Sequence, residues 1–302
     1  MTAHLTRDRL EAARQFMRHE AVSLEHALWS HRFDDGPPDA IVAALAPYQN
    51  SDGGFGHGLE GDLSTPASTA IATSVGLRHL RRAGVAADHP MVAGARDWLA
   101  SVATDGVFPI IGPEVDQAPH APWWDWSDDL AESWNGFRWN PTAEILAHLY
   151  VFRGGAPAGL LEAVEARLRR SIAETQLIAG PYDLRCAVVL AETEAAPADL
   201  RRALTRLLVR SVEQHDSASE HAPALDLATS PNGVLASALS DRIEPAAATL
   251  VGGQQADGGW TPFWDWSFVD AAAWAAAKAS WRGTLTRLAV EALAAHGRVE
   301  GL

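Results

Sequence analysis

The chain has 302 residues, 47% of them apolar, and a formal charge of −14, so it can bury a sizeable core and is expected to be a soluble globular protein. The negative charge argues against nucleic acid or an anionic membrane as a partner. No apolar run of about 18 residues occurs and the first residues lack a signal-peptide segment, so we expect a cytoplasmic protein without a transmembrane segment. The single cysteine, Cys186, excludes an intramolecular disulfide.

Apolar spacing predicts helices along most of the chain. The first, over residues 5–28, places Leu10, Ala13, Phe16 and Met17 on one face. Further helices are predicted over residues 38–49, 64–84, 90–103, 140–154, 159–175, 181–194, 197–214, 230–255 and 281–298. β-branched residues do not alternate over any long stretch, so the expected class is all-α, with about a dozen helices.

Two loops are long. One runs from Asp105 to about Asn140 and is rich in tryptophan; the other covers residues 215–233 and is polar. Long loops in compact domains are often functional.

A motif of the form Gln-x-x-Asp-Gly-Gly-aromatic occurs twice, at Gln49–Phe55 and at Gln254–Trp260, and Asp105 begins a degraded copy, "TDGVFP". The copies are separated by roughly one and three steps of about 50 residues, a period that fits one helix hairpin per repeat. About six such hairpins would fill the chain and could close into a single-domain (α/α)6 toroid spanning residues 1–302.

The motif is interpreted as structural. The glycines allow a sharp turn, so Gly53 and Gly258 are expected to have positive φ or close backbone contacts. The aspartate can cap backbone N–H groups, the glutamine can bridge to a neighbouring turn, and Phe55 and Trp260 can anchor the turn in apolar surroundings.

The motif resembles the repeat of the squalene–hopene cyclase and protein prenyltransferase β-subunit superfamily. The stretches "YQNSDGGFGHGLEGD", "APWWDWSDD" with "NPTAEIL", "QQADGGWTPFWDWS" and "WRGTLTRLAVEALAAHGR" resemble, more closely, bacterial single-toroid prenyltransferase-like proteins over nearly the whole chain. That group commonly has Leu-Glu-Pro-Asp where this chain has Leu59-Glu60-Gly61-Asp62. The resemblance implies an (α/α)6 toroid with an active site in its central cavity.

The resemblance also implies which residues face that cavity. Residues that follow the conserved turns would lie at its mouth, and the Trp-rich loop would cover one end. The expected substrate-binding residues are His57, Trp123, Trp124, Trp126, Trp139, Trp264, Trp266, Trp281 and Arg282. Asp265, between two of these tryptophans, is expected at the same place.

A cavity lined by indoles and a few acids suits acid-initiated cyclisation or isomerisation of an apolar isoprenoid. This reaction needs a proton donor, dry walls and aromatic faces that stabilise a carbocation. A carboxyl close to a second carboxylate can stay protonated, so Glu60, Asp62 and Asp125 are the candidate acids. No nucleotide-binding glycine motif follows a predicted strand, and no redox cofactor is expected.

Several alternatives stay open. The cyclase motif Asp-x-Asp-Asp is matched only with an extra residue, at Asp125, Asp128 and Asp129, and Asp128–Glu132 has the spacing of a magnesium-binding motif without its usual partner motif. The zinc ligands of protein prenyltransferases cannot be mapped, and Cys186 is expected to be a packed core thiol. The ring could instead belong to a carbohydrate-active (α/α)6 enzyme or to a toroid that binds a ligand without catalysis. Either a monomer or a homodimer is compatible with the sequence.

Overall fold

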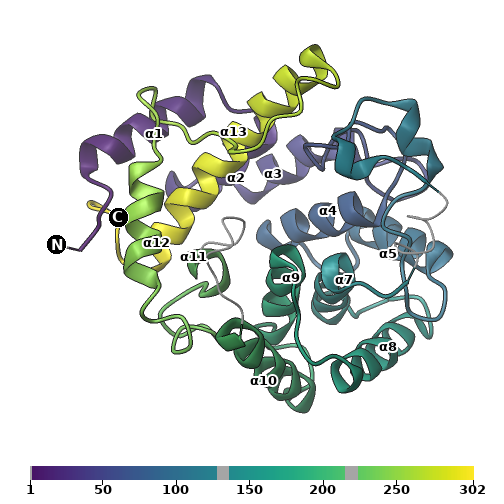
Figure 1. The fold of residues 1–302 in the computed structure, drawn as a ribbon. Helices are drawn as coiled ribbons and strands as arrows, with labels where there is room; N and C mark the ends of the chain where they lie inside the picture. Colours follow the sequence, from purple (N-terminus) through teal and green to yellow (C-terminus); the bar gives the residue numbers. More distant parts are fainter. Residues whose placement is uncertain (1, 128–135, 215–223) are drawn as a thin grey trace. The chain divides into compact units, whose positions relative to one another are not determined.

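The computed structural model describes residues 2–127, 136–214 and 224–302 (Figure 1). Within these ranges the regular structure is helical, and β-type pairing is limited to isolated bridges, which confirms the all-α class. The same ranges contain no helix with both the length and the apolarity needed to cross a bilayer.

The chain divides into two compact units. The first, called the terminal unit, combines residues 1–40 with residues 216–302, and the second, called the central unit, holds residues 41–215. Helix α3, Pro38–Leu45, runs across the boundary in sequence.

The described helices of the terminal unit come from both ends of the chain. They are α1 (Arg7–His19), α2 (Ser23–Phe33), α11 (Ala224–Leu227), α12 (Ile243–Gly252) and α13 (Ala271–Ala295). The predicted face of α1, from Leu10 to Met17, is buried and shares one core with Trp29, Trp260 and Leu293. The chain ends are paired, since the N–H of Leu5 donates to the carbonyl of Arg298, and the N–H of Glu300 donates to that of Leu5, both at 2.9 Å.

The central unit contains six of the described helices and three short 3₁₀ segments. The helices are α4 (Ala70–Arg82), α5 (Pro90–Val102), α7 (Trp139–Val151), α8 (Leu160–Glu174), α9 (Pro181–Ala191) and α10 (Ala198–Gln214); the 3₁₀ segments are η1 (Ala46–Tyr48), η2 (Pro113–Gln117) and η3 (Pro122–Trp124). Helix α4 starts at Thr69, whose hydroxyl caps the N–H of Ala72 at 3.2 Å. Helix α7 packs against α4, α8 and α9. Nearly every residue of α4 and α7 is buried, so these two helices form the inner layer of this unit.

Three predicted helices differ from those observed. The one predicted over residues 5–28 is interrupted between His19 and Ser23 and forms α1 and α2. Residues 230–242 form successive turns closed mainly by hydrogen bonds to the third preceding residue, and only Ile243–Gly252 forms a helix. Helix α13 begins ten residues before the predicted start at Trp281, because Asp270 caps the N–H groups of Ala272 and Ala273 at 3.0 and 2.9 Å.

Candidate active site

The two complete motifs, called turn 1 (Gln49–Phe55) and turn 2 (Gln254–Trp260), share one hydrogen-bond pattern. In each, the glutamine amide donates to the carbonyl of the first glycine at 2.9 Å, and the aspartate accepts from the N–H of the second glycine at 2.9 and 3.1 Å. The glutamine also donates to a neighbouring helix, from Gln49 to the carbonyl of Met91 and from Gln254 to that of Arg9. Gly53 and Gly258 have φ of 93° and 92°, which confirms their predicted role.

A threonine on the following helix completes each turn. The N–H of Phe55 donates to the hydroxyl of Thr73 in α4 at 3.0 Å, and that of Trp260 donates to Thr286 in α13 at 2.9 Å. Both bonds are buried, so each helix is fixed to its turn by a donor that has no access to water.

The degraded copy, called turn 3 (residues 104–107), is closed by two hydrogen bonds of 2.9 Å between the backbones of Thr104 and Val107. Asp105 and Gly106 both have positive φ, at 52° and 75°. A Cβ at Gly106 would lie 2.3 Å from the carbonyl oxygen of Ala163 in α8. The first glycine of turn 1 packs in the same way on Gly94 of α5, and that of turn 2 on Ala12 of α1.

Two of the expected cavity residues bind to these turns. Arg282 donates to both carboxylate oxygens of Asp257 at 2.8 Å and lies over the ring of Phe16 at 4.6 Å. His57 is exposed, and its Nε2 lies 2.8 Å from the Oδ1 of Asn50 in turn 1. Both side chains therefore stabilise turn geometry in this structure.

The carboxylate pair that follows turn 1 lies in the central unit. Asp62 is buried, with a relative exposure of 4%, and Glu60 is partly buried. Desolvation, followed by the charge of Asp62, raises the pKa of Glu60 to about 7, against the opposing charges of Arg78 and Arg185. Glu60 can therefore exist in both protonation states near neutral pH.

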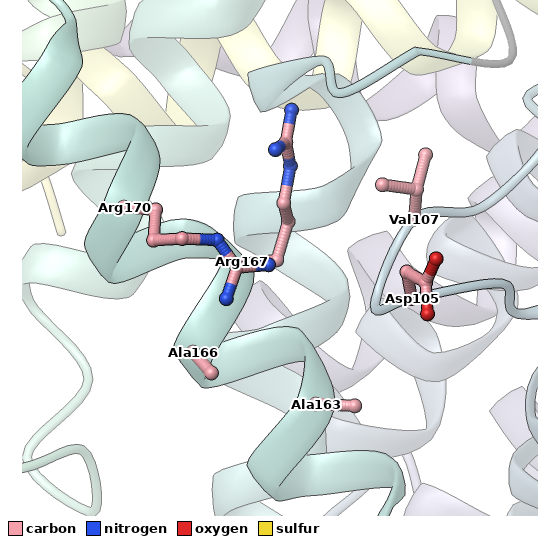
Figure 2. A pocket seen from close by; sticks show the side chains of 6 residues that line it. All are labelled: Asp105, Val107, Ala163, Ala166, Arg167 and Arg170. Carbon is pink, nitrogen blue, oxygen red and sulfur yellow. The ribbon is translucent and has the colours of Figure 1, made fainter.

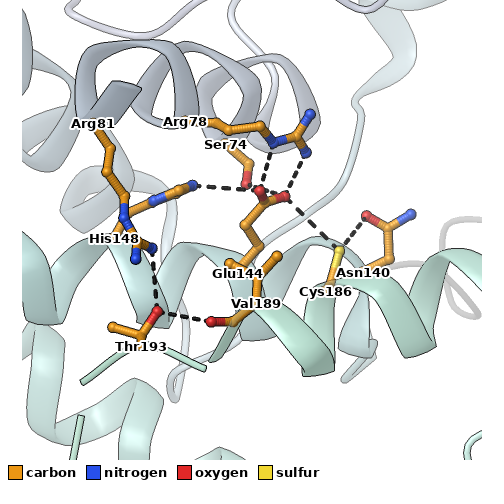
Figure 3. A network of polar contacts seen from close by, with 9 residues as sticks. All are labelled: Ser74, Arg78, Arg81, Asn140, Glu144, His148, Cys186, Val189 and Thr193. Atoms are coloured by element: carbon orange, nitrogen blue, oxygen red, sulfur yellow. Dashed lines mark hydrogen bonds and ion pairs between the residues drawn. The ribbon is translucent and has the colours of Figure 1, made fainter. Parts of the chain in front are cut away.

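The carboxyl of Glu60 is affected by the charge of Arg78, which forms an ion pair with the buried Glu144 (Figure 3). The Nε and Nη2 of Arg78 each donate to the carboxylate of Glu144 at 2.6 Å. The hydroxyl of Ser74 donates to the same carboxylate at 3.3 Å. Glu144 is 3% exposed, whereas the side chain of Arg78 is 42% exposed. The arginine charge holds the pKa of Glu144 far below its usual range, although desolvation opposes this. The pair thus presents a fixed, partly accessible guanidinium close to Glu60.

Cys186 and His148 complete the network. The Cys186 thiol lies 3.5 Å from the Oδ1 of Asn140 and 3.9 Å from Glu144, and burial raises its pKa well above the usual value. The Nε2 of His148 lies 3.6 Å from Glu144, and desolvation lowers the pKa of this imidazole. Cys186 is a packed core thiol, as predicted, and is not activated as a nucleophile.

The aromatic residues of the central unit lie near the carboxylate pair or in the core. Trp124 and Trp126 pack against a cluster that includes Leu63, Ile71 and Val115. Trp123 is 45% exposed, and Trp139 is buried, at 8%, with its ring edge-on to Phe137. Asp125 is exposed and lies 3.1 Å from the Nε2 of His120.

The tryptophans of the terminal unit form two ring pairs. Trp264 packs edge-to-face on Trp281 at 5.1 Å, and Trp266, which is fully buried, packs on Trp274 at 5.5 Å. Asp265 accepts from the indole N–H of Trp274 at 3.0 Å and from the N–H of Ser267 at 2.8 Å. Asp265 is therefore engaged in local structure.

The possible magnesium motif, Asp128–Glu132, lies outside the described residues. Among the described residues, no three His, Cys, Asp or Glu side chains gather in a way that could hold a metal ion. Two hollows, of about 410 and 260 Å³, are lined by residues other than the candidate acids and the tryptophans.

Sequence reasoning did not single out Arg78, Glu144 and His148. A signal was present in "NPTAEILAHLY", where Glu144 and His148 stand four residues apart in an otherwise apolar helix. Charged residues with such apolar neighbours need a buried partner, and Arg78 in α4 supplies it. Comparison with models of protein families and with curated proteins finds no match to this chain.

Proposed function

We propose that this protein is a terpenoid cyclase-like enzyme in which Glu60 protonates an isoprenoid-type substrate and so starts a cyclisation or isomerisation. The observation that carries the proposal is the partly buried Glu60 carboxyl beside the buried Asp62, with its pKa raised to about 7. About half of such a carboxyl is protonated at neutral pH, so it can act as the acid without an external proton source.

In the proposed step, the substrate double bond takes the proton of Glu60 and forms a C–H bond. A second double bond can then attack the cation and close a ring. Transfer of a proton from a carbon next to the new cation to the Glu60 carboxylate forms a double bond and restores the acid. The apolar cluster around Leu63 and Ile71, with the faces of Trp124 and Trp126, would exclude water and stabilise the cation.

We also propose that the hairpins belong to an (α/α)6 toroid. Turn 1 precedes α4 and packs on the helix that follows it, α5; turn 3 precedes α7 and packs on α8. Turn 2 precedes the last helix, α13, and packs on the first helix, α1. This cyclic order, together with the paired chain ends, is what a closed ring of hairpins would require.

A carbohydrate-active enzyme is the second candidate, but it has less support. Its expected acids are the aspartates next to the tryptophan clusters, Asp125 and Asp265. Both are exposed and bound to local partners. A non-catalytic toroid that binds an apolar ligand would keep the aromatic cluster without needing a protonated Glu60.

The test is incubation of the protein with linear isoprenoids and prenylated aromatics, followed by mass spectrometry of the products. We expect turnover by the wild type, its loss in Glu60→Gln, and little change in Asp125→Asn, which is the matched control for removal of a carboxyl charge. Asp62→Asn should slow the reaction, because loss of the Asp62 charge lowers the pKa of Glu60 and leaves a smaller fraction of it protonated. Absence of turnover with every isoprenoid, together with tryptophan quenching by oligosaccharides, would instead support the sugar-binding candidate.

A further inference from the structure

The larger of the two hollows described above lies in the central unit, and neither Glu60 nor Asp62 lines it. It has a volume of about 410 Å³ and is bordered by Asp105 and Val107 of turn 3 and by α8, beside the point where Gly106 rests on that helix (Figure 2). The α8 wall consists of Ala163, Ala166, Arg167 and Arg170. Two arginines against one carboxylate give this lining a positive charge in a chain whose formal charge is −14.

The arginines of α8 differ in their bonding. Arg169 donates to Glu165 at 2.7 Å and to Asp199 at 2.8 Å, so its charge is compensated. Arg167 and Arg170 are three residues apart and therefore lie on one face of the helix. In the part of the chain that the structure describes, neither forms an ion pair, and the buried Nε of Arg167 has no acceptor. Two guanidinium groups are thus available at the hollow.

The walls of the hollow are fixed. The Arg167 guanidinium lies over the ring of Phe137 at 5.3 Å, which restricts its rotamers. On the facing wall, the Thr104 and Val107 backbone bonds close turn 3, and Gly106 rests on the backbone of α8. A rigid hollow needs little ordering when a ligand binds.

We propose that this hollow binds the phosphate group of a small hydroxylated phosphomonoester through Arg167 and Arg170. Guanidinium groups match phosphate oxygens in geometry and charge. Ala163, Ala166 and Val107 offer apolar contact to the carbon skeleton, and Asp105 can accept a hydrogen bond from a ligand hydroxyl. The volume exceeds that of a phosphate ion alone, which leaves room for the rest of such a molecule. The proposal does not depend on the role of Glu60.

The test is isothermal titration calorimetry of the full chain with glycerol 3-phosphate, inorganic phosphate and glycerol. We expect saturable binding of glycerol 3-phosphate, weaker binding of inorganic phosphate and none of glycerol. Arg170→Gln should weaken the binding of both anions by about tenfold or more, the usual effect of losing a charge-assisted hydrogen bond. Arg169→Gln is the matched control, because it removes the same charge from the same helix, and its affinity should stay within about twofold of wild type.

Asp105→Asn gives an independent result. Asparagine tolerates the positive φ of this position, so the turn should be preserved. Removal of the carboxylate should tighten inorganic phosphate binding several-fold, because a like charge facing the anion is lost. Circular dichroism of each variant checks that it is folded. The proposal is overturned if neither anion binds saturably, if Arg169→Gln weakens binding as much as Arg170→Gln, or if Asp105→Asn leaves phosphate affinity unchanged or lower.

Discussion

The first glycine of turn 2 offers a sharp test of the structure through the substitution Gly258→Ala. The added methyl carbon would lie 2.2 Å from the carbonyl oxygen of Ala12 and 2.4 Å from its carbonyl carbon, where real Cβ atoms do not come within 3.0 Å. The turn must therefore move away from α1 by about 1 Å, which would break the bond from the Gln254 amide to the carbonyl of Arg9 in α1. This bond contributes about 1 kcal/mol, and the φ of 92° costs an alanine about 1–2 kcal/mol more.

The expected loss of about 2–3 kcal/mol corresponds to a fall of roughly 7 °C in the midpoint of thermal unfolding, measured by far-UV circular dichroism. Gly297→Ala is the matched control in the same unit, since Gly297 also has positive φ, at 64°, but no atom lies within 4 Å of the added carbon. Its loss should be limited to the backbone strain of about 1–2 kcal/mol. Equal midpoints for the two variants would refute the packing of turn 2 on α1.

Three further predictions concern buried polar groups. Thr286→Val should lower the unfolding free energy by about 1–3 kcal/mol in chemical denaturation, because the buried N–H of turn 2 loses its acceptor. Glu25→Gln should destabilise the protein more than Glu144→Gln in the same assay. Glu25→Gln removes a charged partner from Arg287, which is 3% exposed, whereas Arg78, the partner of Glu144, reaches solvent. Because the folded state raises the pKa of Glu60 from 4.5 to about 7, it binds more protons than the unfolded state between these values, so wild-type stability should fall as pH rises from 4.5 to 7. Glu60→Gln should flatten that part of the pH–stability curve, and an unchanged slope would contradict the raised pKa.

Local rules predicted the turns and most helices. The periodic apolar face of α1 and the glycine positions needed no tertiary information, because each follows from backbone geometry and from burial of one helix face. The start of α13 was misplaced because ten alanine-rich residues carry little amphipathic signal, and its aspartate cap, Asp270, was not recognised. Residues 230–242 were misassigned because an apolar pattern at helical spacing can also line consecutive turns.

The candidate site was predicted less completely. The pairing of Glu60 with Asp62 was visible in the sequence, since only Gly61 stands between them in the same loop. The arginine that meets Glu144 lies on another helix, so Arg78 could not be assigned without the packing of α4 on α7. Arg282 was expected to bind substrate, and its guanidinium forms an ion pair with Asp257 of turn 2, a partner that the sequence did not indicate.

The contact made by the first glycine of each turn has a consequence for how such a chain can diverge. The glycine rests on a backbone carbonyl of the neighbouring helix, at Gly94, Ala163 or Ala12. Every amino acid supplies that carbonyl, so a substitution on the receiving helix leaves the contact intact provided its side chain points elsewhere. The demand on sequence is strict at the glycine and weaker at its partner, although a Cβ at Gly94 would lie 3.2 Å from the Cα of Gly53. Copies of the repeat can therefore lose their glutamine and second glycine, as turn 3 has, and still dock in the same way.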